Sequence, residues 1–290
     1  MGDFTLARKN EIFAGNQATT QRAAPIEGVM RQDVLKELGW EVPVDVAPLP
    51  SQGVVYPKSS GLHGKQSVEI KSMTAKEEDI LMSRAYNKMG TTITELIRSC
   101  LIDKTFDPAD LLIGDRQALI VAIRVTGYGQ DYKCDVNCGA CDKRGTDTFD
   151  LSTLEVENIK VDPVTPGVNE FEVVLPISKK RVIIKFMTGR DEEELSTTVE
   201  RRRKIFGDQA ENTITSRLAH QIISIDGVTD KNKINMFAIN MPARDSKFLR
   251  DFVLKNEPGL KMRVPYRCSH CGETSEVALP LGANFFWPQD

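Results

Sequence analysis

Apolar residues follow helical spacing in some segments and alternate strictly with polar residues in others, so the chain predicts helices mixed with short strands. Residues 67–73 alternate like a strand. Capping-box patterns at residues 74–77 and 92–95 predict helices that run to about residues 85 and 102. A strongly apolar helix is expected to begin at Asp115 and to end at Gly127.

The second half of the chain repeats this mixture. Tyr132, Cys134 and Val136 alternate as a strand, and residues 170–187 read as a β-hairpin. Met262, Val264 and Tyr266 alternate as another strand. Four further helices are expected between the hairpin and this last strand, at residues 188–206, 213–223, 232–239 and 242–255. Together these elements predict an α+β fold made of helical segments and short β-hairpins.

The first part of the chain has a different composition from the rest. Residues 1–55 are poor in apolar clusters, and Pro43, Pro48 and Pro50 favour extended backbone before them. They predict either a disordered tail or an extended N-terminal arm that becomes ordered along a neighbouring subunit. Residues 56–290 are expected to form one globular domain.

Net charge and hydropathy exclude two classes of partner. The chain has 38 Lys and Arg against 41 Asp and Glu, a net charge of −3, so no broad basic field is available for nucleic acid. No run of residues is apolar and long enough to cross a membrane, and the first residues lack the apolar core of a signal peptide. In a reducing cytoplasm, the six cysteines favour metal binding over disulfides.

Two C-x-x-C motifs carry the clearest chemical signal. Cys138 and Cys141 form the first, Cys268 and Cys271 form the second, and each follows an alternating strand. Four thiolates in two such pairs are typical of a tetrahedral zinc site in which no position is left for water or substrate. We therefore predict a structural zinc ion held by a zinc-ribbon-like unit. Its halves are expected at residues 130–154 and 262–284, flanking an insert of a hairpin plus helices at 158–260.

Glycines and a fifth cysteine lie near these motifs. Gly139 and Gly272 are expected to relax the two cysteine turns. Cys134 stands four residues before Cys138, which matches the cluster spacing of radical S-adenosylmethionine enzymes and leaves an iron–sulfur enzyme as a remote alternative. Ala140 occupies the position where those enzymes usually carry an aromatic residue, so we expect Cys134 to face the core instead.

No catalytic set accompanies the cysteines. The three histidines are scattered, and the sequence contains no P-loop, no G-x-G-x-x-G and no serine triad. The four acidic residues at 191–194 are expected to splay around a helix instead of converging as an acid and base pair. We predict that the protein is not an enzyme.

Several segments resemble one protein family. Residues 49–57, Leu-Pro-Ser-Gln-Gly-Val-Val-Tyr-Pro, are followed by the strand at 68–70 and by Met-Thr-Ala-Lys-Glu-Glu-Asp-Ile-Leu at 73–81. This opening is similar to that of the T-even-type bacteriophage baseplate hub proteins. The Met-Thr-Gly-Arg-Asp-Glu segment at 187–192 and the aromatic tail after the second cysteine pair agree with the resemblance, which covers roughly residues 49–288.

The resemblance implies a virion protein in the hub region of a contractile tail baseplate, made in the host cytoplasm. Expected partners are other baseplate and tail proteins, namely hub, spike, tube or wedge subunits, with several copies in a symmetric assembly. The expected role is to link hub or spike to tube or wedge proteins during assembly. Some relatives are regarded as hub-assembly factors, so a transient chaperone that is not retained in the virion is the alternative.

Overall fold

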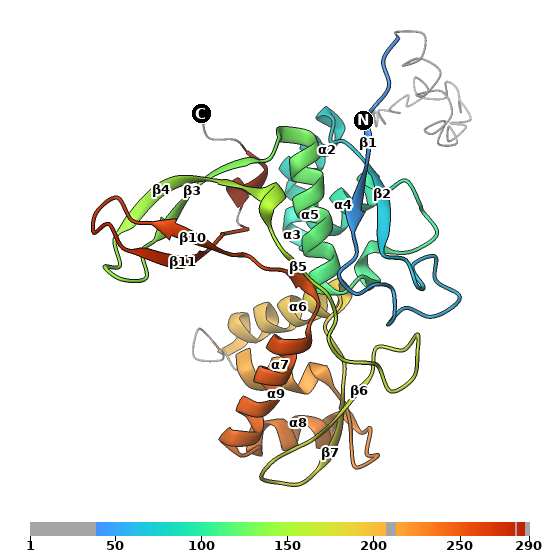
Figure 1. Cartoon of the computed structure of the whole chain (residues 1–290). Coiled ribbons are helices and arrows are strands. Elements are labelled where there is room, and N and C mark those ends of the chain that lie inside the picture. The colour runs from blue at the N-terminus through green and yellow to red at the C-terminus, as the bar shows by residue number, and fades with distance from the viewer. Residues whose placement is uncertain (1–38, 207–212, 282, 288–290) are drawn as a thin grey trace, which may run out of the picture. The chain divides into compact units, whose positions relative to one another are not determined.

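The computed structural model describes residues 39–206, 213–281 and 283–287, and the chain divides into two compact units, Met1–Val42 and Pro43–Asp290. Most of the expected arm therefore lies outside the described residues. The second unit contains every helix and strand that is described below (Figure 1). Helices and short antiparallel strand pairs make up this unit, which confirms the α+β class.

The compact unit begins earlier than the expected boundary at residue 56. Strand β1 (Val44–Pro48) pairs antiparallel with β2 (Ser67–Lys71), and Ala47 is fully buried between that pair and the helices. The backbone N–H of Ser51 donates a buried hydrogen bond of 2.8 Å to Asp115. With these pairings, the globular part starts at Pro43. Pro48 can form the end of β1 because proline is tolerated in an edge strand.

Four helices pack with this strand pair to form the first part of the unit, which we call the body. Helix α5 contacts β1, β2 and α4, and it carries the largest share of the buried apolar side chains among them. The body helices are α2 (Ala75–Met82), α3 (Arg84–Met89), α4 (Thr92–Cys100) and α5 (Ile113–Tyr128), with a short 3-10 turn, η1 (Pro108–Asp110), before α5.

The two predicted capping boxes have different outcomes. Thr74 and Glu77 form the full reciprocal box at the start of α2, as predicted. At α4 the N-cap is Thr91, so Thr92 is the first helical residue and makes no capping bond. The hydroxyl of Thr92 donates instead to the side chain of Asn87, on the preceding helix α3.

Two antiparallel hairpins follow, one directly after α5 and the other after α9. Strands β3 (Asp131–Asn137) and β4 (Arg144–Asp150) form the first, and β10 (Arg263–Arg267) and β11 (Thr274–Ala278) form the second. Although more than a hundred residues separate them in sequence, the hairpins lie side by side (Figure 1). After β11 the chain returns to the body through the short turn η4 (Ala283–Phe286), whose Phe285 packs against Tyr132.

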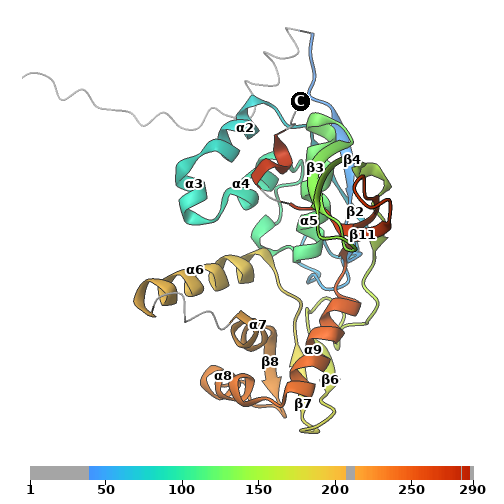
Figure 2. The same cartoon turned by 90° about the vertical axis from the view of Figure 1, so that its left-hand side faces the viewer.

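Between the hairpins lies the predicted insert of strands and helices. Its three-stranded antiparallel sheet has the order β6-β7-β8, and four helices accompany it (Figure 2). The ends of the insert meet in a two-residue ladder of β5 (Val156–Glu157) with β9 (Gly259–Leu260). The other elements are β6 (Phe171–Val174), β7 (Arg181–Ile184), α6 (Gly189–Phe206), α7 (Thr213–Gln221), β8 (Ile222–Ile225), α8 (Lys231–Asn240) and α9 (Ala243–Asn256).

One predicted helix is shorter than expected. The helix at 213–223 ends at Gln221, and Ile222 and Ile225, expected on its apolar face, belong to β8. Strand β8 pairs with β7, placing the fully buried side chain of Ile222 in the core of the insert. None of the helices among the described residues is long and apolar enough to span a membrane.

Candidate metal centre

The four cysteines of the two C-x-x-C motifs converge between the hairpins. The Sγ atoms of Cys138 and Cys271 are 3.8 Å apart, and those of Cys141 and Cys268 are 3.7 Å apart. All four Sγ atoms lie within 4.8 Å of one another. A disulfide would need a distance of about 2.05 Å, so these are four free thiols gathered around one point.

The separations suit a tetrahedral metal ion. A zinc–sulfur bond of about 2.3 Å gives a tetrahedron whose edges are about 3.8 Å, close to the two measured distances. Each of the two measured distances joins a cysteine of the first hairpin to a cysteine of the second. A metal ion at the centre would therefore hold the two hairpins together.

Both cysteine turns have the same backbone geometry. In the first, the N–H of Asp142 donates to the carbonyl oxygen of Cys138 at 2.9 Å, and in the second Gly272 donates to Cys268 at the same distance. The residue two positions after the first cysteine of each pair directs its N–H at that cysteine's Sγ, at 3.4 Å. Two independent turns thus offer the same arrangement of donors around the sulfur atoms.

The positive backbone angle in each turn falls after the second cysteine. Gly272 has φ 75°, and Asp142 has φ 56° at the matching position. Of the two glycines that were predicted to relax these turns, Gly272 does so, whereas Gly139 has no positive φ. Asp142 fills that position in the first turn because aspartate tolerates the left-handed region better than most residues do.

Backbone donors favour the thiolate form of one cysteine in each pair. The N–H groups of Cys141 and Ala140 lower the pKa of Cys138 to about 6. In the second turn, the N–H groups of Cys271 and His270 lower the pKa of Cys268. Since the thiolate is the form that binds metal, the turns prepare both residues as ligands. The cluster is thus a possible metal site.

Cys134 and Cys100 do not join this group. Cys134 lies on the buried face of β3, where burial is the main cause that raises its pKa to about 11. Burial likewise raises the pKa of Cys100, the last residue of α4, to about 12. Both are therefore neutral thiols that pack as small apolar groups, as expected for Cys134.

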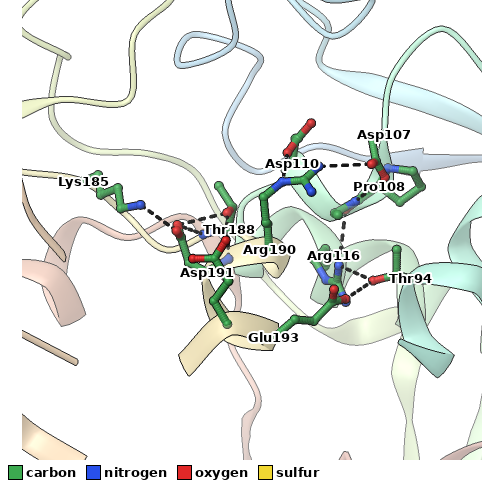
Figure 3. Close-up of polar contacts among 12 residues, drawn as sticks. Thr94, Asp107, Pro108, Asp110, Arg116, Lys185, Thr188, Arg190, Asp191 and Glu193 are labelled. Carbon is green, nitrogen blue, oxygen red and sulfur yellow. Dashed lines mark hydrogen bonds and ion pairs between the residues drawn. The ribbon is translucent and has the colours of Figure 1, made fainter. Parts of the chain in front are cut away.

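A second group of possible ligands was missed by sequence reasoning. Asp191 and Glu194, at the start of α6, come within 4.8 Å of His220 on α7. The ammonium group of Lys185 already lies 2.6 Å from Asp191, and the N–H and hydroxyl groups of Thr188 donate to the same carboxylate (Figure 3). Despite its burial, these donors together with His220 hold the pKa of Asp191 well below its usual range.

The polar network at the start of α6 is structural for that reason. The oxygen atoms of Asp191 already interact with a cation and several donors. These contacts connect α6 to Lys185, directly after β7, and to His220 on α7. Nothing in the sequence signals this contact, because Lys185 directly follows β7, whereas Asp191 and His220 lie on two different helices. The two other histidines, His63 and His270, lie outside both groups of possible ligands.

Ion pairs at the same place join the insert to the body. Arg190 on α6 contacts Asp107 at 3.1 Å and Asp110 at 2.8 Å, both at the turn before α5 (Figure 3). Buried Arg116 on α5 donates to the hydroxyl of Thr94, which in turn donates to Glu193 of α6. The insert is therefore attached to the body by these contacts as well as by the packing of β9 against α5.

A comparison with protein families gives one match. Residues 58–287, most of the chain, match the model of the family described as "T4 bacteriophage base plate protein". Neither a curated protein nor a solved structure matches the chain.

Proposed function

Because the chain belongs to the T4 bacteriophage base plate protein family, we propose that it is a structural component of the hub region of a contractile tail. There it links hub or spike proteins to tube or wedge proteins while the baseplate assembles. It acts by binding other baseplate proteins and not by catalysis. The family match carries this proposal, and the resemblance of residues 49–81 to the hub proteins adds the hub location.

The architecture supports a role in which the protein sets distances and angles between neighbours. One cluster of buried apolar residues includes side chains of both the body and the insert, and three sets of polar and packing contacts also join the two parts. A protein that positions its partners benefits from such a rigid framework, because any bending would be passed on to the assembly. The cluster of cysteines adds a fourth restraint at the outer end of the hairpins.

We further propose that the four cysteines bind one structural zinc ion. Cys138, Cys141, Cys268 and Cys271 would hold it, and all four positions of a tetrahedral ion would be filled by thiolates. Such a closed site leaves no position for a reacting molecule, which agrees with a structural role. Metal binding to sites of this kind contributes on the order of 10 kcal/mol to folding.

The location can be tested with phage that carry an amber mutation in this reading frame. Grown in a non-suppressing host, they should accumulate incomplete baseplates, and purified wild-type virions should contain the chain when analysed by mass spectrometry. A cryo-EM map of the wild-type tail should place it at the hub. Normal tails from the amber mutant would contradict the proposal.

The same experiment separates the structural component from the assembly chaperone. A chain that is abundant in infected cells, required for baseplates and missing from purified virions acts as a transient factor. A chain that is retained in fixed ratio to the other baseplate proteins is a structural component.

A further inference from the structure

One end of the insert carries exposed side chains that the fold itself does not need. The loop between β6 and β7 lies at the same end as α8 in both views (Figures 1 and 2). Asp245, in the first turn of α9, ties this loop to α9 because its carboxylate accepts bonds from the N–H groups of Ile177 and Ser178 at 2.8 and 2.9 Å. We call five exposed side chains of this loop, of α8 and of the first turn of α9 the tip surface, namely Ile177, Lys179, Met236, Ile239 and Arg244.

The apolar members of the tip surface are strongly exposed. Met236 and Ile239 are 62% and 61% accessible, and both lie on the face of α8 opposite its buried residues. Ile177 in the hairpin loop is 44% accessible. Exposed apolar residues gathered at one end of a fold are typical of a protein contact.

The charged members, Lys179 and Arg244, form no ion pair within the described part of the chain. The charge of Lys179 acts on the buried carboxylate of Asp245, whose pKa it helps to lower. The two nearby carboxylates are already in use, since Asp245 accepts from backbone N–H groups and Asp226 pairs with Lys180 and accepts from the N–H of Arg181. The tip surface therefore presents positive charge beside apolar side chains.

Both cations occupy positions that local physics disfavours. Lys179 has φ 57°, a left-handed conformation in which glycine or asparagine is the usual choice. Arg244 lies in the first turn of α9, where the positive end of the helix dipole repels a cation. Side chains that break local rules without an ion pair in the fold are expected where function requires them.

We propose that the tip surface binds an acidic amphipathic segment of another baseplate protein. Carboxylates of that segment would pair with Lys179 and Arg244, and its apolar side chains would cover Met236, Ile239 and Ile177. The inference rests on the proposed function for the origin of the partner, whereas the chemistry of the partner follows from the charges and apolar residues on this surface.

The probe for this binding is a synthetic amphipathic helix whose apolar face is Leu and whose polar face is Glu, measured by fluorescence anisotropy with the purified full-length chain. The same peptide with Lys in place of Glu is the control for charge. We expect the Glu peptide to bind and the Lys peptide not to bind, with an affinity that falls as salt is added. The double variant Lys179→Asn and Arg244→Glu should weaken binding about tenfold or more.

Two features keep the test independent of unfolding. Both substitutions suit their backbone positions better than the native residues do, so the variant should melt at or above the temperature of the wild type. The pair Arg84→Glu and Lys88→Gln changes the charge by the same amount on exposed α3 and should leave binding unchanged. Ile239→Ser tests the apolar contact and should weaken binding as well.

Equal binding of the two peptides, or equal loss in the α3 and tip variants, would overturn the proposal. Vesicles that contain anionic phospholipid are the third probe, and binding to them in place of the Glu peptide would assign the tip surface to a membrane instead. Since every measurement uses the purified chain, failure here leaves the baseplate location untouched, and that location is tested separately with virions.

Discussion

The Nε atom of Arg124, on α5, donates a hydrogen bond of 3.0 Å to the carbonyl oxygen of Phe285, which lies 161 residues later in the chain. The other two guanidinium nitrogens donate to the carbonyl oxygens of Gly129 and Asp131. One buried side chain thus joins the body, the start of the first cysteine hairpin and the aromatic C-terminal turn.

Replacing this arginine should be costly. Arg124→Met keeps most of the side-chain volume but removes the donors of three carbonyl oxygens, so we expect the free energy of unfolding to fall by about 2 to 4 kcal/mol in urea denaturation. Arg144→Met is the matched control, since exposed Arg144 pairs with Asp135 at the surface and should change stability by less than about 1 kcal/mol. Similar losses in the two variants would show that Arg124 does not join these segments.

The cysteine cluster makes a prediction about metal content. Protein purified without added metal should contain one zinc ion per chain by mass spectrometry, and Cys268→Ser should lose the ion and melt at a lower temperature. Cys134→Ala should keep its zinc, because that buried thiol lies outside the cluster. Iron in place of zinc, or a Cys268→Ser variant with unchanged metal content, would contradict a zinc site made of these four cysteines.

The lowered pKa of Glu77 predicts that the protein loses stability in acid. Burial raises its pKa, but hydrogen bonds from Lys71, Ser99 and Thr74 outweigh that effect and lower the pKa to about 2. A carboxylate with a lowered pKa stabilises the fold above its unfolded pKa of about 4.3, and this contribution disappears as the pH falls toward 2. The contribution is up to about 3 kcal/mol.

The measurement compares urea unfolding of the wild type and of Glu77→Gln at pH 6 and at pH 3. The wild type should be the more stable of the two at pH 6, and the difference should shrink at pH 3. Both proteins carry the same cysteine cluster, so acid release of a metal affects them equally. A difference that does not depend on pH would mean that the charge of Glu77 contributes nothing.

The fourth prediction concerns the close packing of α5 against residues 258–259 at the end of the insert, which we call the neck. A Cβ atom added to Gly114, at the start of α5, would overlap the carbonyl group of Pro258, which is backbone and cannot turn away. Gly114→Ala should therefore destabilise the protein by about 1 to 3 kcal/mol in urea unfolding.

Gly127→Ala on the same helix is its control. Its added Cβ would lie 3.1 Å from the Cβ of Met73, a tight contact but not an overlap, and alanine is the better helix former, so stability should change by less than about 1 kcal/mol. If Gly114→Ala were equally harmless, the neck would not be tightly packed in solution.

The features predicted correctly from the sequence are those that short segments determine. The capping box at Thr74 and the strands that precede Cys138 and Cys268 each depend on a few adjacent residues. Convergence of the two cysteine pairs could also be anticipated, because the chemistry of four thiolates supplies the long-range information that spacing alone lacks.

The features that were missed depend on contacts between distant segments. Ile222 and Ile225 are three residues apart, which suits one face of a helix, and only pairing with β7 makes them a strand. Residues 43–55 contain prolines typical of an arm, yet pairing with β2 and the bond from Ser51 to Asp115 bring them into the body. Similarly, the contact of Asp191 with His220 needs the fold that brings α6 and α7 together.

The wide spacing of the cysteine pairs has a consequence for how the chain is made. Cys141 and Cys268 are 127 residues apart, and the whole insert lies between the two pairs. During translation the first hairpin emerges with only half of a ligand set, and the entire insert must be synthesised before the other half appears. A chain released before Cys271 could therefore never complete the cluster, so a filled site would mark a subunit whose insert has been synthesised in full before it enters an assembly.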